Sequence, residues 1–186
     1  MNKNFTHIAF TNSVKNQQEK YGTRNAYSRM EKSVGSNHLS PQETNFIQER
    51  DSFYMATVSE NGWPYVQHRG GPKGFVTVIN NTTLAYADFR GNGQYISTGN
   101  INDSNKTSII MMNYPSRQRL KIWAESDIID SGENTELEDK LNVNSTSAKI
   151  ERVVLLKVKA FDWNCPQHIT PRYTEDEISQ MRHGIL

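Results

Sequence analysis

Short runs of strand-forming residues joined by turn signals constrain the fold of this chain more than any other feature. Residues 53–59, FYMATVS, are rich in aromatic and β-branched side chains, which favour strands. The pair Asn61-Gly62 follows, and both residues tolerate the positive φ angles of a two-residue hairpin turn. Residues 63–69 are therefore expected to be the return strand of a β-hairpin.

The same alternation of strands and turns continues toward the C-terminus. Asn80-Asn81 marks a second hairpin, and further strands are expected at residues 74–79, 83–89, 108–113, 120–129 and 153–163. A succession of six or seven short strands, mostly joined by hairpins, predicts a closed antiparallel barrel and a mainly β fold. The tyrosines within or beside these strands are expected in the core: Tyr86, Tyr95 and Tyr114.

Helices are expected at three places around this barrel. Residues 40–43, SPQE, form a capping box with proline at the first helical position. A helix should run from there to about residue 50, with Phe46 and Ile47 facing inward. A second capping box at residues 174–177, TEDE, begins a terminal helix, and a short helix is expected at residues 93–101.

Residues 1–39 differ from the rest of the chain because they contain few core-forming side chains. We expect them to form an irregular, partly helical arm that must pack against another part of the protein. The chain is therefore divided into an N-terminal arm, residues 1–39, and one barrel domain, residues 40–186. The first twenty residues lack the apolar stretch of a secretion signal, so none is expected.

Charge, hydropathy and cysteine content together narrow the class of protein and its partners. There are 21 basic and 20 acidic residues, and the net charge of +1 is too small to attract nucleic acid or an anionic membrane in general. No apolar run approaches the ~18 residues that a transmembrane helix needs. The single cysteine, Cys165, excludes an internal disulfide and fits a reducing cytoplasm. We therefore expect a cytoplasmic protein without a nucleic-acid or membrane partner.

Charge is nevertheless uneven along the chain. Residues 61–121 carry seven basic and two acidic side chains, whereas residues 125–139 carry seven acidic side chains and no basic one. One interpretation is that the two segments form differently solvated faces of the protein. The other is that the basic middle segment binds an anionic ligand.

Two glycine-containing clusters in the basic segment suit phosphate binding. In residues 67–74, QHRGGPKG, the absence of a side chain at Gly70 lets the backbone approach a ligand between two basic residues, Arg69 and Lys73. In residues 88–94, DFRGNGQ, a strand meets a helix start whose amide groups can bind an anion. The candidate side chains in this second cluster are Arg90, Asn92 and Gln94. The alternatives are an ordinary glycine-rich connection and a helix cap with one surface charge.

Two further clusters lie near strand ends. In residues 116–121, alternation places Arg119 and Lys121 on one strand face, either as solvated charges or directed toward a partner's ligand. In residues 162–168, DWNCPQH, an indole can stack on an aromatic ligand and polar groups can bond its edges; the candidates are Trp163, Gln167 and His168. Cys165 is expected to be buried, and no metal site is expected because no second pair of ligands stands near its C-x-x-H spacing.

Taken in order, four blocks of the sequence resemble the flavin-binding proteins related to pyridoxamine 5′-phosphate oxidase. They are RDSFYMATVSENGWPYVQHRGGPKGF, TLAYADFRGNGQYISTGNI, NYPSRQRLKIWAE and FDWNCPQHITPRY. The likeness covers about residues 50–180, and YGTRNAYSRME in the arm is also typical of that group. The resemblance implies an FMN-binding split β-barrel, mainly β with flanking helices, which forms a homodimer with two FMN molecules at the subunit interface.

The resemblance also implies roles for the candidate residues. The flavin phosphate and ring would be held from the first cluster by Arg69, Gly70 and Lys73. The strand-to-helix turn would contact the phosphate through Arg90, Asn92 and Gln94. The partner subunit would supply Gln118, Arg119 and Lys121. The ring would be lined by Trp163, Gln167 and His168, with a slot offered by aromatic residues at positions 63, 65, 86 and 95.

Two departures from the family pattern limit the expected function. A basic residue commonly stands in this group where the chain has Gly93, and the true oxidases carry an R-x-H motif near the last strand that is absent here. They also carry a helix for the substrate phosphate, whereas residues 131–150 are short and acidic. We therefore expect an FMN-dependent oxidoreductase that does not oxidise vitamin B6 phosphates. The alternatives are a flavin-binding module without turnover, such as a sensor or carrier, and an oligonucleotide-binding barrel.

Overall fold

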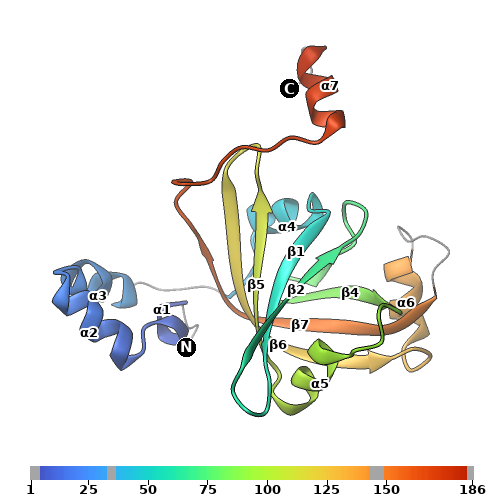
Figure 1. Cartoon of the computed structure of the whole chain (residues 1–186), viewed down its shortest axis with the longest axis horizontal. Coiled ribbons are helices and arrows are strands. Elements are labelled where there is room, and N and C mark those ends of the chain that lie inside the picture. Colours follow the sequence, from blue (N-terminus) through green and yellow to red (C-terminus); the bar gives the residue numbers. More distant parts are fainter. Residues whose placement is uncertain (1–4, 33–36, 143–148, 184–186) are drawn as a thin grey trace.

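One antiparallel sheet of seven strands forms the centre of the computed structural model, which describes residues 5–32, 37–142 and 149–183 (Figure 1). The strands are β1 (Ser52–Val58), β2 (Pro64–Gly70), β3 (Thr77–Asn80), β4 (Thr83–Phe89), β5 (Lys106–Asn113), β6 (Gln118–Asp130) and β7 (Ile150–Trp163). Both predicted hairpins are confirmed, and Gly62 adopts the positive φ of +84° that the first turn requires. The mainly β fold class is therefore confirmed.

The strand order shows where the barrel is open. The order is β2-β1-β5-β6-β7-β4-β3, so the sheet ends at β2 and β3, and no ladder of the described strands joins these two edges. β3 is short and pairs only with the first part of β4, as far as Ala85. The second half of β4 consequently has an open edge on the side away from β7. The expectation of a closed barrel is wrong in this respect, and the barrel is split.

Alternating burial along the strands produces the core. In β1, for example, Phe53 and Met55 are buried whereas Tyr54 between them is exposed. The inward side chains of the long strands meet in one apolar cluster, to which Ile122 and Leu156 contribute. Burial of these apolar side chains is the main favourable contribution to folding.

Seven helices surround the described sheet: α1 (Thr6–Ala9), α2 (Asn12–Lys20), α3 (Arg24–Lys32), α4 (Pro41–Gln48), α5 (Ile96–Asp103), α6 (Thr135–Asn142) and α7 (Glu175–Arg182). Both capping boxes are confirmed, at Ser40 for α4 and at Thr174 for α7. α4 places Phe46 and Ile47 in the core as predicted.

Two helices differ from the prediction. α5 begins at Ile96 rather than near residue 93, because residues 91–95 form a turn in which Gly93 and Tyr95 have positive φ angles. α6 was not predicted, since its sequence TELEDKLN has only two apolar side chains. Those two, Leu137 and Leu141, pack against a second apolar cluster beside β7, and this packing stabilises the helix.

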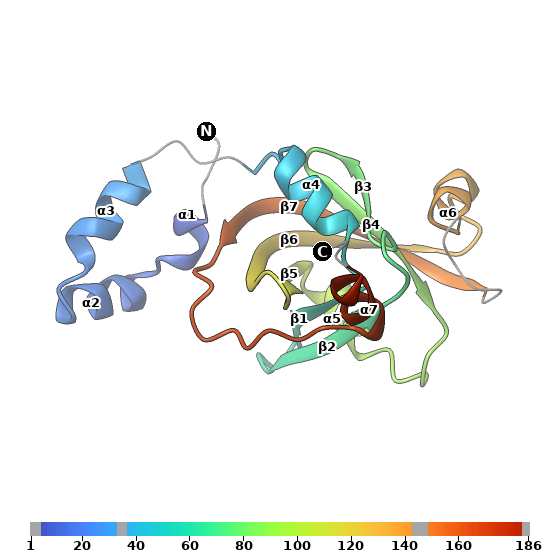
Figure 2. The ribbon, with the colours of Figure 1, turned by 90° about the horizontal axis from the view of Figure 1, so that it is seen from above.

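The three N-terminal helices lie at one side of the barrel in both views (Figures 1 and 2). Glu31 forms an ion pair at 2.8 Å with Lys15, which connects α2 and α3, and a second ion pair with Arg24 inside α3. Phe5 stacks on Trp123 of β6 with a centroid separation of 5.9 Å. The arm thus contacts the outer surface of the sheet. Among the described residues, no helix is long and apolar enough to cross a membrane.

Candidate functional site

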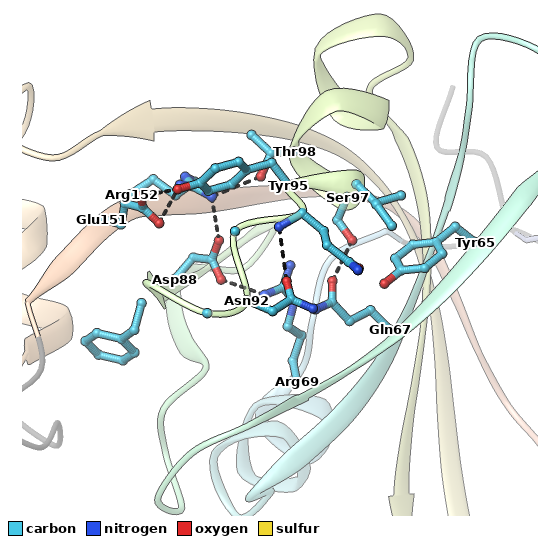
Figure 3. A pocket seen from close by; sticks show the side chains of 15 residues that line it. Tyr65, Gln67, Arg69, Asp88, Asn92, Tyr95, Ser97, Thr98, Glu151 and Arg152 are labelled. Carbon is cyan, nitrogen blue, oxygen red and sulfur yellow. Dashed lines mark hydrogen bonds and ion pairs between the residues drawn. The ribbon is translucent and has the colours of Figure 1, made fainter.

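A cavity of about 230 Å³ opens where the barrel is split. β2 contributes Gln67 and Arg69 to its wall, and Asp88 comes from β4. The turn at residues 91–95, the first residues of α5 and the start of β7 complete the lining (Figure 3). The cavity therefore joins segments that are far apart in the sequence at the point where the strands leave a gap.

A buried ion network spans the split. Arg69 Nη1 lies 2.6 Å from Asp88 Oδ1, and the other carboxylate oxygen, Oδ2, lies 3.2 Å from Arg152 Nη1. Asp88 and Arg152 are each only 7% exposed. An unpaired buried charge is strongly disfavoured, and Asp88 is paired with two guanidinium groups. The carboxylate thereby connects β2 with β4 and β7 across the open part of the ladder.

Arg69 has a donor to spare after this contact. Its Nε–H is buried and has no hydrogen-bond partner within the part of the chain that the structure describes. A guanidinium is a rigid fork of five N–H donors, and buried donors in native proteins are almost always paired. The unpaired Nε–H is therefore a place where the oxygen of a ligand can bind.

Backbone donors lie on another side of the same cavity. Tyr95 is the N-cap of α5, has a left-handed backbone with φ +51°, and provides no side-chain cap to the helix. The first amide groups of a helix have no intrahelical acceptor and carry the positive end of the helix dipole. Ser97 Oγ donates to Gln67 Oε1 at 2.9 Å, which fixes this helix start against β2. The arrangement suits an anion such as a phosphate.

Arg152 is held at the rear of the cavity by several contacts. Arg152 Nη2 lies 2.7 Å from Glu151 Oε2, and Arg152 Nη1 donates to Thr98 Oγ1 at 3.1 Å. Its guanidinium also lies over the ring of Tyr95, 4.8 Å from the centroid, and the Tyr95 hydroxyl donates to Glu151 Oε1 at 2.8 Å. With Arg69 and Asp88, the cluster contains two basic and two acidic groups, so its formal charges balance.

A second cavity of about 190 Å³ shares Arg69 and Asp88 with the first. Aromatic side chains line it, namely Phe75, Tyr86 and Phe89. Burial raises the pKa of Tyr86, so its phenol stays protonated at physiological pH. The Arg69–Asp88 pair therefore separates a polar cavity from a more aromatic one.

The structure brings four of the predicted site residues in the glycine-containing clusters to these cavities. Arg69, Asn92 and Gln94 line the first cavity, and Gly70 lines the second beside Arg69. The remaining two residues of the glycine-containing clusters, Lys73 and Arg90, are exposed and line neither of these two cavities.

The residues expected from the partner subunit lie on the outer face of the sheet instead. Strand register places Arg119 opposite Met112, and Lys121 opposite Ile110. Gln118 lies at the start of the same strand, where it is exposed and accepts a hydrogen bond from Ser116. Their alternation with buried neighbours directs Arg119 and Lys121 away from the core.

Partly buried apolar side chains flank these two basic residues, and exposed ones lie farther along the same face. On β1 and β2 the same outer face carries Tyr54 and Val66, which are 40% and 61% exposed. Lys121 Nζ forms a 3.2 Å ion pair with Asp162, while Arg119 Nε is buried without a hydrogen-bond partner among residues 5–32, 37–142 and 149–183. A contiguous apolar face of this kind is typical of a protein interface. We call it the outer face and define it by Tyr54, Val58, Val66, Ile110, Met112, Arg119, Lys121 and Trp123.

The residues predicted near the end of β7 do not reach the cavities. Trp163 packs edge-on against Phe46, and its Nε1–H donates to Glu43 Oε1 at 2.7 Å. Gln167 and His168 are exposed in the following segment. Cys165 is also exposed, so its predicted burial is wrong. The strand ends at Trp163, and the chain then leaves the sheet in a loop that exposes the thiol.

Two important residues of the cavity, Glu151 and Arg152, were not predicted from the sequence. Arg152 and Glu151 precede the apolar run of β7, and only the long-range register that pairs Asp88 with Arg152 brings them to the site.

Tyr95 was expected in the core and in the aromatic slot; it is 46% exposed, lines the first cavity and covers Arg152. Nothing in the local pattern indicates its left-handed backbone. Of the other slot residues, Tyr65 lines the first cavity and Tyr86 the second, while Trp63 lines neither. No group of three or more metal-binding side chains occurs in the described ranges.

Comparisons with known proteins bear on the fold of this chain. A family model described as pyridoxamine 5′-phosphate oxidase matches residues 39–164. Among solved structures, HupZ from Group A Streptococcus is 16% identical with a TM-score of 0.55, over 73% of this chain and 99% of that one. A protein from Lactobacillus delbrueckii described as a candidate pyridoxamine 5′-phosphate oxidase is 21% identical with a TM-score of 0.54, over 69% and 97%.

An FMN-binding protein from Syntrophomonas wolfei is 14% identical with a TM-score of 0.50, and the match covers 66% of this chain and 86% of that one. No curated protein matches the sequence. At these identities the structural matches establish the fold, which is that of the split β-barrel proteins.

Proposed function

This chain belongs to the pyridoxamine 5′-phosphate oxidase family, and on that basis we propose that it is a cytoplasmic, homodimeric FMN protein that acts as a flavin-dependent oxidoreductase. The observation that carries the proposal is the unpaired, buried Nε–H of Arg69 beside the uncapped start of α5. A solved protein of the same fold is described as FMN-binding.

The residues of the first cavity fit a flavin phosphate. Its formal charges balance, so an anion would be held by directed donors rather than by an excess of positive charge. Those donors are the Nε–H of Arg69, the amide groups at the start of α5 and the side chains of Asn92 and Gln94. Backbone amides at a helix start and a guanidinium are the groups that proteins use for phosphate.

The ring of the flavin would need a second set of residues. The outer face carries Arg119 and Lys121 among apolar side chains, and in a two-fold dimer these would reach the partner's site. A basic group near the ring stabilises a reduced, anionic flavin, while the ring itself accepts the hydride. The aromatic second cavity beside Arg69 offers an apolar surface within the same subunit.

The proposal does not extend to vitamin B6 phosphates. The chain lacks the R-x-H motif near the last strand, and in that region Trp163 is engaged with Glu43. We expect no formation of pyridoxal phosphate. The alternative, a flavin carrier or sensor without turnover, differs from an oxidoreductase in whether a substrate reduces the bound flavin, and anaerobic reduction assays separate the two.

Titration of FMN into the apo-protein tests the proposal. Arg69→Ala removes a charge-assisted hydrogen bond of about 1.5–3 kcal/mol, so FMN affinity should fall roughly tenfold to hundredfold. Lys15→Ala is the matched control, because Lys15 pairs with Glu31 in the arm and should leave the affinity unchanged. Equal affinities of the two variants would remove Arg69 from the site. A wild-type protein that does not bind FMN at all would refute the proposal.

A further inference from the structure

Asp88 places a carboxylate in a cavity for which we have proposed an anionic ligand, and this position requires an explanation. We propose that Asp88 is a positioning residue, anchored by Arg152, that holds Arg69 across the split with its Nε–H directed to the ligand. The part of this inference that concerns phosphate rests on the proposed function. The part that concerns Arg69 does not, because it describes the protein without a ligand.

The two carboxylate oxygens of Asp88 accept hydrogen bonds from two different arginines. Oδ1 accepts from Arg69 Nη1 at 2.6 Å, and Oδ2 accepts from Arg152 Nη1 at 3.2 Å. Since each oxygen has its own guanidinium, the carboxylate cannot turn without losing one of the two contacts. Figure 3 shows Asp88 between the two arginines. The carboxylate therefore fixes the position of Arg69 relative to β4 and β7.

Arg152 serves as the anchor because its other contacts hold it in place. It lies opposite Asp88 in the β4–β7 ladder, pairs with Glu151, donates to Thr98 and packs on Tyr95. Its side chain is only 8% exposed. Arg152 therefore has little freedom to turn toward a ligand, whereas Arg69 keeps one buried donor without a partner in the described chain. The two arginines thus have different roles.

Arg69 also depends on Asp88 for its conformation. Its side chain is 16% exposed and crosses from an edge strand to a strand with which β2 forms no ladder. A long cationic side chain without a partner in such a place turns toward water, because burial of an unpaired charge is disfavoured. Without the carboxylate, Arg69 and Arg152 would also repel each other.

For the Asp88→Asn variant, the proposal predicts a change in FMN affinity opposite in sign to the change expected from charge repulsion alone. If Asp88 only repelled a phosphate, Asp88→Asn would strengthen FMN binding. If it positions Arg69, the same change weakens FMN binding and leaves riboflavin, which has no phosphate, unaffected. A purely structural role would weaken both flavins together. The ratio of the two affinities therefore separates the three possibilities.

The first experiment uses apo-protein and needs no flavin. Hydrogen exchange of the arginine Nε–H groups is followed by NMR in the full chain, with the Arg69 signal assigned from Arg69→Lys. We expect a protected Arg69 Nε–H in the wild type, loss of that protection in Asp88→Asn, and no change in the control Asp127→Asn. Asp127 forms a comparable but exposed 2.7 Å ion pair with Lys157. Equal protection in wild type and Asp88→Asn would overturn the proposal.

The second experiment measures FMN and riboflavin affinities of the same variants. In Asp88→Asn the dissociation constant of FMN should rise about tenfold while that of riboflavin changes by less than about twofold. Arg152→Lys keeps the positive charge but removes the two-pronged guanidinium that anchors Asp88. It should therefore also lower the preference for FMN over riboflavin. This variant replaces Asp88→Asn if the latter does not fold. An unchanged or increased preference for FMN contradicts the proposal. A wild type that binds neither flavin refutes the proposed function, and the exchange experiment still decides the role of Asp88.

Discussion

The predicted site residues fall into two groups that the fold separates. Arg69, Asn92 and Gln94 meet in one cavity at the split, where they belong to a connected network. Arg119 and Lys121 lie on the outer face among apolar side chains. The first group lines a cavity within one chain, whereas the second lines neither of the two cavities of the same chain. In the dimer that we propose, one chain would therefore carry half of a site.

The largest effect is expected from a charge placed in the outer face. Val66 is 61% exposed beside Ala56, and Val66→Asp would bury an unpaired carboxylate in the proposed dimer interface. We expect the dimer to dissociate in sedimentation velocity, together with a loss of FMN affinity of at least about a hundredfold, because half of the site is then missing.

Met181→Asp is the matched control for this change. Met181 is 40% exposed but lies on α7, outside the outer face, so its variant should remain dimeric and bind FMN. A Val66→Asp protein that stays dimeric with unchanged affinity would show that the subunits associate elsewhere. Added FMN should also raise the melting temperature of the wild type and favour the dimer by mass action.

Mixed dimers test whether the two groups act in one site. Arg69→Ala and Arg119→Ala are each expected to weaken FMN binding, Arg119 by about tenfold or less because it contacts the ring from the partner. In a heterodimer of the two variants, one site contains both substitutions and the other contains neither. About half of the sites should then bind with wild-type affinity. If no site recovers, the two arginines belong to the same chain's site.

The fold could be predicted further than the site. The hairpin at Asn61-Gly62 and the capping boxes at Ser40 and Thr174 depend on neighbouring residues only, and all three were predicted correctly. α6 was missed because its stability comes from contacts with β7. The same reason explains why the site was predicted only in part. Arg152 lies opposite Asp88 because of the register between β4 and β7, which no local sequence pattern specifies.

Two aromatic residues also show how far a local sequence pattern can predict the place of a side chain. Tyr86 was expected in the core and is buried, because its place in a strand decides its orientation. Tyr95 was expected there too, but its left-handed backbone turns it over Arg152 at the cavity. Side chains inside regular strands can be oriented from alternation, while those in irregular turns cannot.

The smallest effect is expected for Glu43, the hydrogen-bond partner of Trp163. It tests whether Trp163 belongs to the cavity residues, to the outer-face residues or to neither. Trp163 donates to Glu43, whose side chain also accepts from Ser40. Burial of Glu43 raises the pKa of its carboxyl, but the hydrogen bonds from Ser40 and Trp163 outweigh burial, and the pKa lies below its ordinary value of 4.5. The bonds therefore stabilise the fold above about pH 4.5, and this contribution is lost as the pH falls through the lowered pKa.

Chemical denaturation of Glu43→Gln between pH 3 and 7 measures this contribution. The variant should be less stable than the wild type by about 1–2 kcal/mol near neutral pH, and the difference should shrink toward acid pH, because the lost bonds are to a charged group. Glu177→Gln is the matched control, since Glu177 closes the capping box of α7 in an exposed position and should matter less. FMN affinity should be unchanged in Glu43→Gln if the indole has a structural role. A tenfold weaker affinity in this variant would instead mean that Trp163 must be held by Glu43 to line the flavin, which would add the end of β7 to the site.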